Sequence, residues 1–187
     1  MATQNAYGTA APRDLSRHQV QLMLCRNEDG TAIAGPGGPE GGTFYIPPGG
    51  GWGSGTLILE SEHAQSNTKT DIFCFEAVLP PEYVAGADVN LVVHAKYAGA
   101  GTAGIVTIDA EVYELDDEGA AAAIRASSTK VLTNAFADHT FDDITETNLA
   151  PGDKLMVLIR TVIQETGGAN DLYAQIGNVE LQIDIKG

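Results

Sequence analysis

The chain has 187 residues, a net charge of −15 and two cysteines. A chain of this length can close its own hydrophobic core without disulfides or a metal ion. A surface this acidic repels phosphate backbones, so we expect no nucleic-acid partner. We find neither the basic and apolar regions of a secretory signal nor a run of about 18 apolar residues, so we expect no membrane span.

Residues 1–55 predict an N-terminal segment that differs in composition from the rest of the chain. Residues 19–25 alternate apolar and polar side chains, which predicts one short strand. Residues 26–55 predict a Gly/Pro-rich arm, because half of the 22 glycines lie there and no regular helix or central strand tolerates that density. We expect four apolar residues in the arm to contact a partner: Phe44, Tyr45, Ile46 and Trp52.

Residues 56–187 predict an all-β domain. Alternation typical of strands recurs at 56–60, 71–79, 88–97, 105–115, 128–133, 138–145, 153–164 and 174–186. The phase slips at Gly177 and Asn178, which predicts a β-bulge. Many strands with loops of unequal length favour an antiparallel β-sandwich, of the jelly-roll type, over a closed barrel.

Two connections in this domain carry more specific predictions. Residues 118–126 include four consecutive alanines, which favour a helical turn or two. The glycine-rich residues 97–104 are typical of a hairpin connection. If the strands on either side of that hairpin pair, Tyr97 and Tyr113 approach each other.

The cysteines and histidines do not form a recognisable site in the sequence. Cys25 and Cys74 lie in apolar runs, where we expect buried thiols, and a bridge between them stays open. No two of the four histidines share a short metal-ligand spacing, so we expect each at the surface or in a loop: His18, His63, His94 and His139. With no nucleophile or phosphate-loop motif either, we expect no catalytic residues, no cofactor and no enzymatic activity.

Carboxylates offer two further candidate sites. Asp109 and Glu111 share one strand face, and we expect a solvated sheet face rather than the carboxylate pair of a glycosidase. The acidic turn at Asp116, Asp117 and Glu118 is a candidate calcium site, because calcium prefers clustered carboxylate and carbonyl oxygens. A hairpin tip rich in turn-forming residues explains the same three residues.

Four stretches share a pattern with a known class of proteins: FCFEAVLPPEYVAGADVNLVVHAKY, TIDAEVYEL, LAPGDKLMVLIRTVIQETGG and IGNVELQIDIKG. They contain an aromatic strand, a Leu-Pro-Pro-x-Tyr corner and a Pro-Gly-Asp turn. On this pattern residues 73–187 resemble the β-sandwich structural proteins in virions of tailed bacteriophages. The resemblance implies a capsid decoration (cement) protein, commonly a homotrimer, that binds the major capsid protein or another virion protein. It implies no catalytic residues.

We therefore expect a non-enzymatic virion structural protein, assembled in the host cytoplasm and bound to its own copies. The alternative is a carbohydrate- or receptor-binding β-sandwich module, such as a fibre or spike head, which shares this architecture. A third hypothesis is a small hydrolase or lyase on the same fold, which needs a deep pocket where polar side chains converge.

Overall fold

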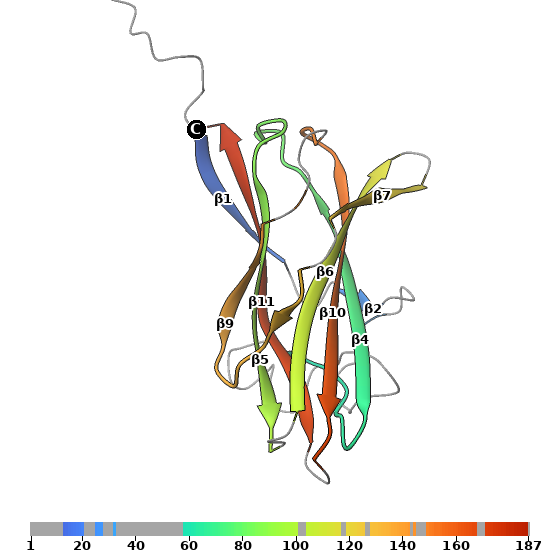
Figure 1. Ribbon diagram of the computed structural model, residues 1–187. Coiled ribbons are helices and arrows are strands. Elements are labelled where there is room, and N and C mark those ends of the chain that lie inside the picture. Colours follow the sequence, from blue (N-terminus) through green and yellow to red (C-terminus); the bar gives the residue numbers. More distant parts are fainter. Residues whose placement is uncertain are drawn as a thin grey trace, which may run out of the picture.

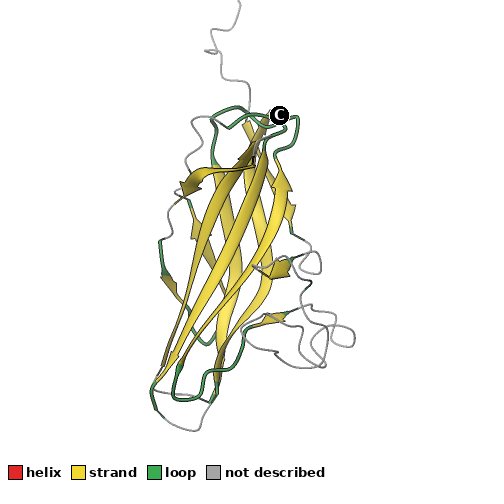
Figure 2. Cartoon of the chain, turned by 90° about the vertical axis from the view of Figure 1, so that its right-hand side faces the viewer, coloured by secondary structure: helices red, strands yellow, loops and turns green. Residues whose placement is uncertain are grey.

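A computed structural model of the chain describes residues 13–20, 25–27, 32, 58–100, 104–116, 119–125, 128–142, 144, 149–167 and 171–186. These residues form two packed antiparallel sheets (Figure 1), and the long strands run nearly from end to end of the molecule (Figure 2). The antiparallel β-sandwich predicted from the sequence is confirmed. No helix among the described residues has the length and hydropathy to cross a membrane.

Each sheet takes its strands from distant parts of the chain. Sheet A contains β1 (Arg13–Gln19), β3 (Leu59–Glu60), β5 (Val89–Gly99), β9 (Ala137–Phe141) and β11 (Leu172–Lys186), in the order β1-β11-β5-β9 with β3 also paired to β11. Sheet B contains β2 (Arg26–Asn27), β4 (Thr68–Val78), β6 (Gly104–Asp116), β7 (Gly119–Arg125), β8 (Lys130–Val131) and β10 (Lys154–Glu165), in the order β2-β4-β10-β6-β7 with β8 also paired to β6. Strands β4, β5, β6, β9, β10 and β11 alternate between the two sheets, as in a jelly roll, while β7 and β8 stay beside β6 in sheet B.

The N-terminal strands differ in position from the prediction. Strand β1 ends at Gln19 and pairs with β11 in sheet A, whereas β2 begins at Arg26 and pairs with β4 in sheet B. The strand predicted over residues 19–25 falls largely between β1 and β2. Residues 21–24 lie outside the described residues.

Two of the predicted connections are wrong. The alanine-rich stretch predicted to be helical is strand β7, which pairs with β6 in an irregular register. Backbone pairing with the edge of β6 outweighs the high helix propensity of alanine, because tertiary context overrides intrinsic propensity. Residues 97–104 do not close a hairpin, because β5 belongs to sheet A and β6 to sheet B. Tyr97 and Tyr113 therefore lie in different sheets.

The core lies between the inner faces of the two sheets. Period-two alternation places every second residue inside, and burial of one such side chain contributes about 1.5 to 3 kcal/mol. Fully buried residues from both sheets include Phe73, Leu91, Val93, Ile108, Leu155, Ile159, Ile176 and Val179. The predicted bulge is confirmed, since the pairing of β11 with β5 shifts between Ile176 and Asn178.

The cysteines are two thiols on opposite sides of sheet B. Cys25 lies in the core, and burial raises its pKa to about 12, with the neighbouring Cys74 adding to the rise. Cys74 alternates with the buried Phe73 and Phe75, so its side chain lies on the outer face. The two thiols are not joined by a disulfide.

One end of the sandwich is closed by the corner that follows β4. Tyr83 is fully buried there, and its hydroxyl donates a 2.7 Å hydrogen bond to the carbonyl of Ala87. The backbone on either side of it is bound to the end of β11, since Lys186 N donates to Glu82 O at 2.9 Å. The Tyr83 side chain therefore packs at this end of the core and also donates a hydrogen bond to the buried carbonyl of Ala87.

We predict that Tyr83→Phe lowers the free energy of unfolding by about 1 to 2 kcal/mol, because the Ala87 carbonyl loses its buried donor. Tm should fall by about 2 to 8 °C in calorimetry. The matched control is Tyr113→Phe, which removes a hydroxyl that bonds Glu111 on the outer face of sheet B. We expect the control to change stability by less than about 0.5 kcal/mol. Equal losses from the two substitutions would contradict the corner's role.

Candidate functional site

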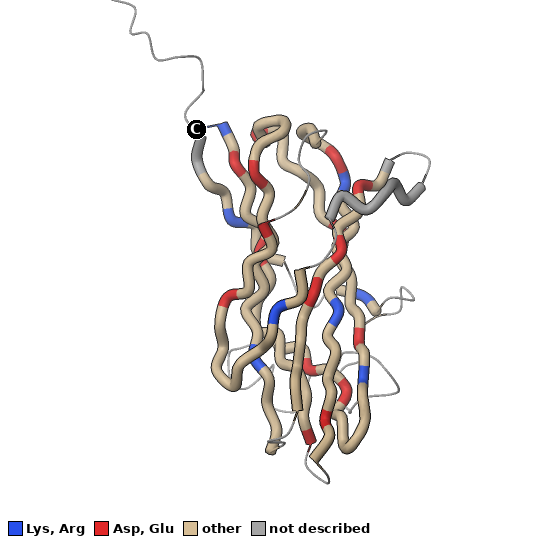
Figure 3. Tube along the Cα trace, viewed as in Figure 1, with Lys and Arg blue, Asp and Glu red and all other residues tan. Residues whose placement is uncertain are grey.

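The outer faces of the two sheets differ in chemistry. Sheet B presents several aliphatic residues outward, among them Val78, Ile105 and Val131, which are 60%, 54% and 63% exposed. Sheet A presents aromatic, amide and charged side chains from β5, β9 and β11. Acidic residues are spread over both sheets (Figure 3). Aromatic rings and polar groups meet on sheet A, so we take its outer face as the candidate site.

The first feature of this face is a pair of stacked rings at the β5–β9 edge. The rings of His94 and Phe136 lie 5.1 Å apart, centroid to centroid, with 8° between their planes. Asp138 holds the imidazole in place, since its Oδ1 lies 2.6 Å from Nδ1 of His94. The bulge residue Gly177 lies against these rings, and a Cβ there would be in tight contact, 3.2 Å, with the Phe136 ring.

A second pair of stacked rings lies at the other end of the same face. His63 stacks on Tyr173 with 4.1 Å between centroids and 9° between planes. Its Nδ1 lies 3.2 Å from Asp171 Oδ2, and its Nε2 lies 3.1 Å from Glu60 Oε1. Both contacts are hydrogen bonds only when both ring nitrogens carry a proton. The two ends of the face thus share one arrangement, an aspartate that holds a histidine on an aromatic ring.

Lys96 and Gln175 lie between the two ring pairs. They are direct cross-strand partners on β5 and β11, and the Lys96 ammonium lies 4.9 Å from the centroid of Phe136. In the same register His94 faces Asn178 and Ala98 faces Tyr173. Four residues of β5 therefore separate the ring pairs, a distance of about 13 Å along the strand.

Beside the first ring pair the face is hollowed by about 240 Å³. The lining residues are Arg17, Val92, His94, Asp138, Asn178 and Glu180. Val92 is buried although it lies on the outer face, so it forms an apolar floor. The polar groups of the wall hold one another: Asn178 donates to Glu180 at 3.0 Å, and Arg17 lies 3.7 Å from Glu180. The hollow is therefore a small, mainly polar site with an apolar base.

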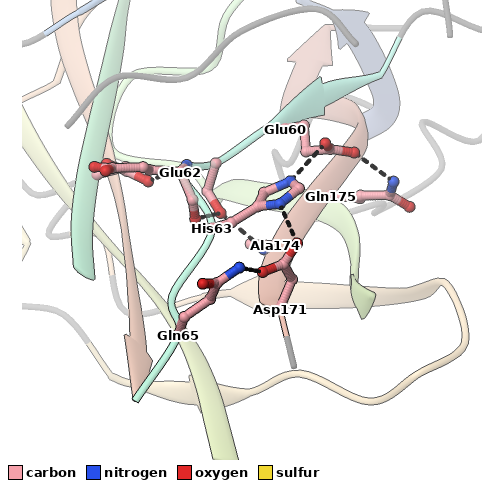
Figure 4. A network of polar contacts seen from close by, with 9 residues as sticks. Glu60, Glu62, His63, Gln65, Asp171, Ala174 and Gln175 are labelled. Atoms are coloured by element: carbon pink, nitrogen blue, oxygen red, sulfur yellow. Dashed lines mark hydrogen bonds and ion pairs between the residues drawn. The ribbon is translucent and has the colours of Figure 1, made fainter. Parts of the chain in front are cut away.

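The second ring pair is fixed by a short strap, residues 60–65, that joins β3 to β4. Figure 4 shows His63 between Glu60 and Asp171, with Gln175 bound to Glu60 and Gln65 bound to Asp171. The hydrogen bond from Gln65, and after it the bond from His63, lowers the pKa of Asp171. Burial, and then the nearby acids, raises the pKa of Tyr173, so its hydroxyl stays protonated at neutral pH.

The strap is also tied to the core from beneath. Asp71 on β4 is fully buried, and its Oδ2 accepts a 2.7 Å hydrogen bond from the backbone N–H of Glu62. Ser61 is buried too, and its hydroxyl accepts from Ala174 N at 2.8 Å. Burial raises the pKa of Asp71 more than this hydrogen bond lowers it. Asp71 and Ser61 therefore link the strap, and with it the candidate site, to the core.

The carboxylate pair predicted on β6 is solvated only in part. Glu111 is half-buried and accepts a 2.7 Å hydrogen bond from Tyr113. Asp109 is only 4% exposed, because Arg160 from β10 binds it through two nitrogens, with Nη2 2.8 Å from Oδ2. The expectation of a solvated face is wrong for Asp109, since the sequence does not show which cation lies across the strand pair.

Several predicted site residues lie outside the described part of the chain. This holds for the arm residues Phe44, Tyr45, Ile46 and Trp52, and for Asp117 and Glu118 of the acidic turn. Asp116 ends β6, and its side chain is not described. Within the described residues no three His, Cys, Asp or Glu side chains are grouped to hold a metal ion.

The histidines follow the prediction in part. His18 is exposed on β1 and His63 lies in a loop, whereas His139 is directed inward from β9, where burial lowers its pKa. His94 and His63 each combine an acid with an aromatic ring, and no spacing in the sequence indicates this. The only local signal is the alternation that places His94 and Lys96 on the polar side of one strand.

A larger cavity, about 720 Å³, lies between β1 and β4. Its lining is mainly apolar and includes Val20, Phe75, Ala77, Val78, Leu181 and Ile183. It contains neither a stacked ring pair nor a histidine held by a carboxylate. The hollow on sheet A is smaller, but it alone of these two cavities is lined by a histidine that a carboxylate holds against an aromatic ring.

Comparison with known proteins finds no matching family and no matching curated sequence. Solved structures with a similar architecture include TmCBM61 in complex with β-1,4-galactotriose, with 13% identity, a TM-score of 0.42, and coverage of 91% of this chain and 87% of that one. TmCBM27, described for mannan recognition, shows 12% identity and a TM-score of 0.41, with 92% and 99% covered. The enzymatically active domain of tailspike protein 4 from bacteriophage CBA120 shows 12% identity and a TM-score of 0.38, with coverage of 92% of this chain and 19% of that one. Scores this low leave the function to be argued from the residues themselves.

We predict that Asp71 makes stability fall as pH rises. Its folded-state pKa is raised, so the protonated acid favours the folded chain. This contribution is fully present below the unfolded value of about 3.9 and is lost as pH rises through the folded value. Asp71→Asn removes this dependence, so its stability relative to the wild type should increase with pH in urea unfolding measured from pH 3 to pH 8. A difference that is constant with pH would contradict the burial of an ionising group.

Proposed function

We propose that this chain is a non-enzymatic binding module that takes an oligosaccharide, as a glycan or as part of a receptor, on the outer face of sheet A. The observation that carries the proposal is the presence of two carboxylate-held ring pairs on one sheet face. Amide, ammonium and carboxylate groups lie between and beside them.

Sugars have apolar C–H faces and hydroxyl edges, and this face offers a counterpart to each. Stacked rings and the Val92 floor provide flat apolar contact. Gln175 and Asn178 provide both donors and acceptors, and Glu180 provides acceptors, which suits groups that donate and accept at once. Because these side chains already hold one another, less conformational entropy is lost on binding.

The distance between the ring pairs favours an oligomer over a single sugar. A ligand that contacts both must span about 13 Å along β5. Such a ligand also passes over Lys96 and Gln175, which supply polar contacts midway. The absence of catalysis stays part of the proposal.

The test begins with a glycan array and continues with calorimetric titration of any ligand found. We expect Phe136→Ala and Tyr173→Ala each to weaken binding about tenfold, since a lost stacking contact of this kind is worth about 1.4 kcal/mol. Affinity should rise stepwise once the oligomer is long enough to reach both ring pairs. Tyr113→Ala, on sheet B, is the matched control and should bind normally. No glycan binding, or equal losses with the control, would refute the proposal.

A second function, the capsid decoration role that the resemblance implies, has one observation in its favour. Ile105 and Val131 are large apolar residues that lie more than half exposed on the outer face of sheet B. Exposed apolar patches often mark contacts between proteins. In this role the face would bind the major capsid protein or another copy of the chain, as in a trimer.

For this second role we predict that Ile105→Asp with Val131→Asp abolishes co-sedimentation with capsids that lack the protein. An unpaired charge in an apolar interface costs far more than it does at a free surface. Leu15→Asp, an exposed apolar residue on sheet A, is the control and should sediment as the wild type does. Unchanged sedimentation of the double variant would remove the support for a capsid contact through sheet B.

A further inference from the structure

We propose that a single buried water molecule bridges Asp71 Oδ1 and Thr161 Oγ1 on the inner face of sheet B. Asp71 and Thr161 are direct cross-strand partners on β4 and β10. Their side chains therefore point to the same side of the sheet, with Cβ atoms about 4.5 to 5.5 Å apart. Both residues are fully buried.

These two oxygens are notable because neither has a hydrogen-bond partner within the described structure. Buried polar groups almost always find one, because leaving a desolvated group without a partner is unfavourable. Two adjacent unsatisfied oxygens point to a shared partner. A direct bond between them is not formed, so a small molecule with both donors and acceptors must complete the site.

Water fits this site better than a cation. A calcium ion takes six to eight oxygen ligands and a magnesium ion six. Of the oxygens on these two side chains, only Asp71 Oδ1 and Thr161 Oγ1 lack a partner, since Asp71 Oδ2 accepts from Glu62 N. A buried water needs two to four polar partners. It can donate to Asp71 and either donate to or accept from the hydroxyl of Thr161.

The water would act on the strap from below. Asp71 binds the strap with one oxygen and the water with the other, so the water limits rotation of the carboxyl group that holds Glu62. His63, the next residue, stacks on Tyr173. The proposed water site does not depend on the proposed function. Its effect on ligand binding by the outer face of sheet A does rest on that function.

The test uses the full-length chain and two substitutions at one position. Thr161→Val keeps the shape of the side chain and removes the hydroxyl, whereas Thr161→Ser keeps the hydroxyl. We expect oxygen-17 relaxation dispersion to show one fewer slowly exchanging water in Thr161→Val and no change in Thr161→Ser. A crystal structure of the wild type should show a density peak within 3.2 Å or so of both oxygens, an ordinary hydrogen-bond distance.

Three results would overturn the proposal. These are an unchanged dispersion profile in Thr161→Val, a direct Asp71–Thr161 hydrogen bond with no peak between the oxygens, and a peak with the anomalous signal of a metal ion. If Thr161→Val does not fold, the wild-type crystal structure decides by itself. None of these results depends on glycan binding, so failure of the hydration site and failure of the proposed function are distinguishable.

Discussion

The alternation of strand β11 is the constraint on which the rest of the structure depends. Its inward residues, among them Ile176, Val179 and Leu181, pack in the core, and the same strand pairs with β1, β3 and β5. Its outward residues include Tyr173, Gln175 and Asn178, which belong to the candidate site on the outer face of sheet A. One period-two pattern thus closes the core and aligns the site, so a slip of one residue would destroy both. The bulge at Gly177 is the single interruption, and it lies against the rings of Phe136 and His94.

The fold followed from the sequence because its signals are local. Period-two alternation, proline and glycine turns and a phase slip at the bulge can each be read within a dozen residues. The errors arose where a neighbour outweighed the local preference. The alanine run of β7 becomes a strand because the edge of β6 is available to it. Residues 97–104 connect two sheets, and nothing in a glycine-rich loop shows which sheet the next strand will join.

The candidate site was largely hidden because its parts are distant in the chain. His63 meets Asp171 across 108 residues, and His94 meets Asp138 across 44. The sequence around each histidine contains no sign of a site. Only the pairing of strands brings acid, imidazole and aromatic ring together. A jelly roll brings such residues together by construction, since strands adjacent in a sheet are rarely adjacent in the chain. The pairing of Asp109 with Arg160 was hidden for the same reason.

The acidic side chains on the outer face of sheet A are held by neighbouring residues. Each acid there is already engaged: Glu60 with His63 and Gln175, Asp171 with His63 and Gln65, Asp138 with His94, and Glu180 with Asn178 and Arg17. These carboxylates act as fixed acceptors, and hydroxyl groups of a ligand can use their remaining lone pairs. The net charge of −15 meanwhile acts over about a Debye length, near 8 Å at physiological salt, and disfavours polyanions. For the binding function proposed above, local acceptors and a repulsive long-range field would together favour uncharged, hydroxyl-rich ligands, and for these an acidic surface carries no electrostatic cost.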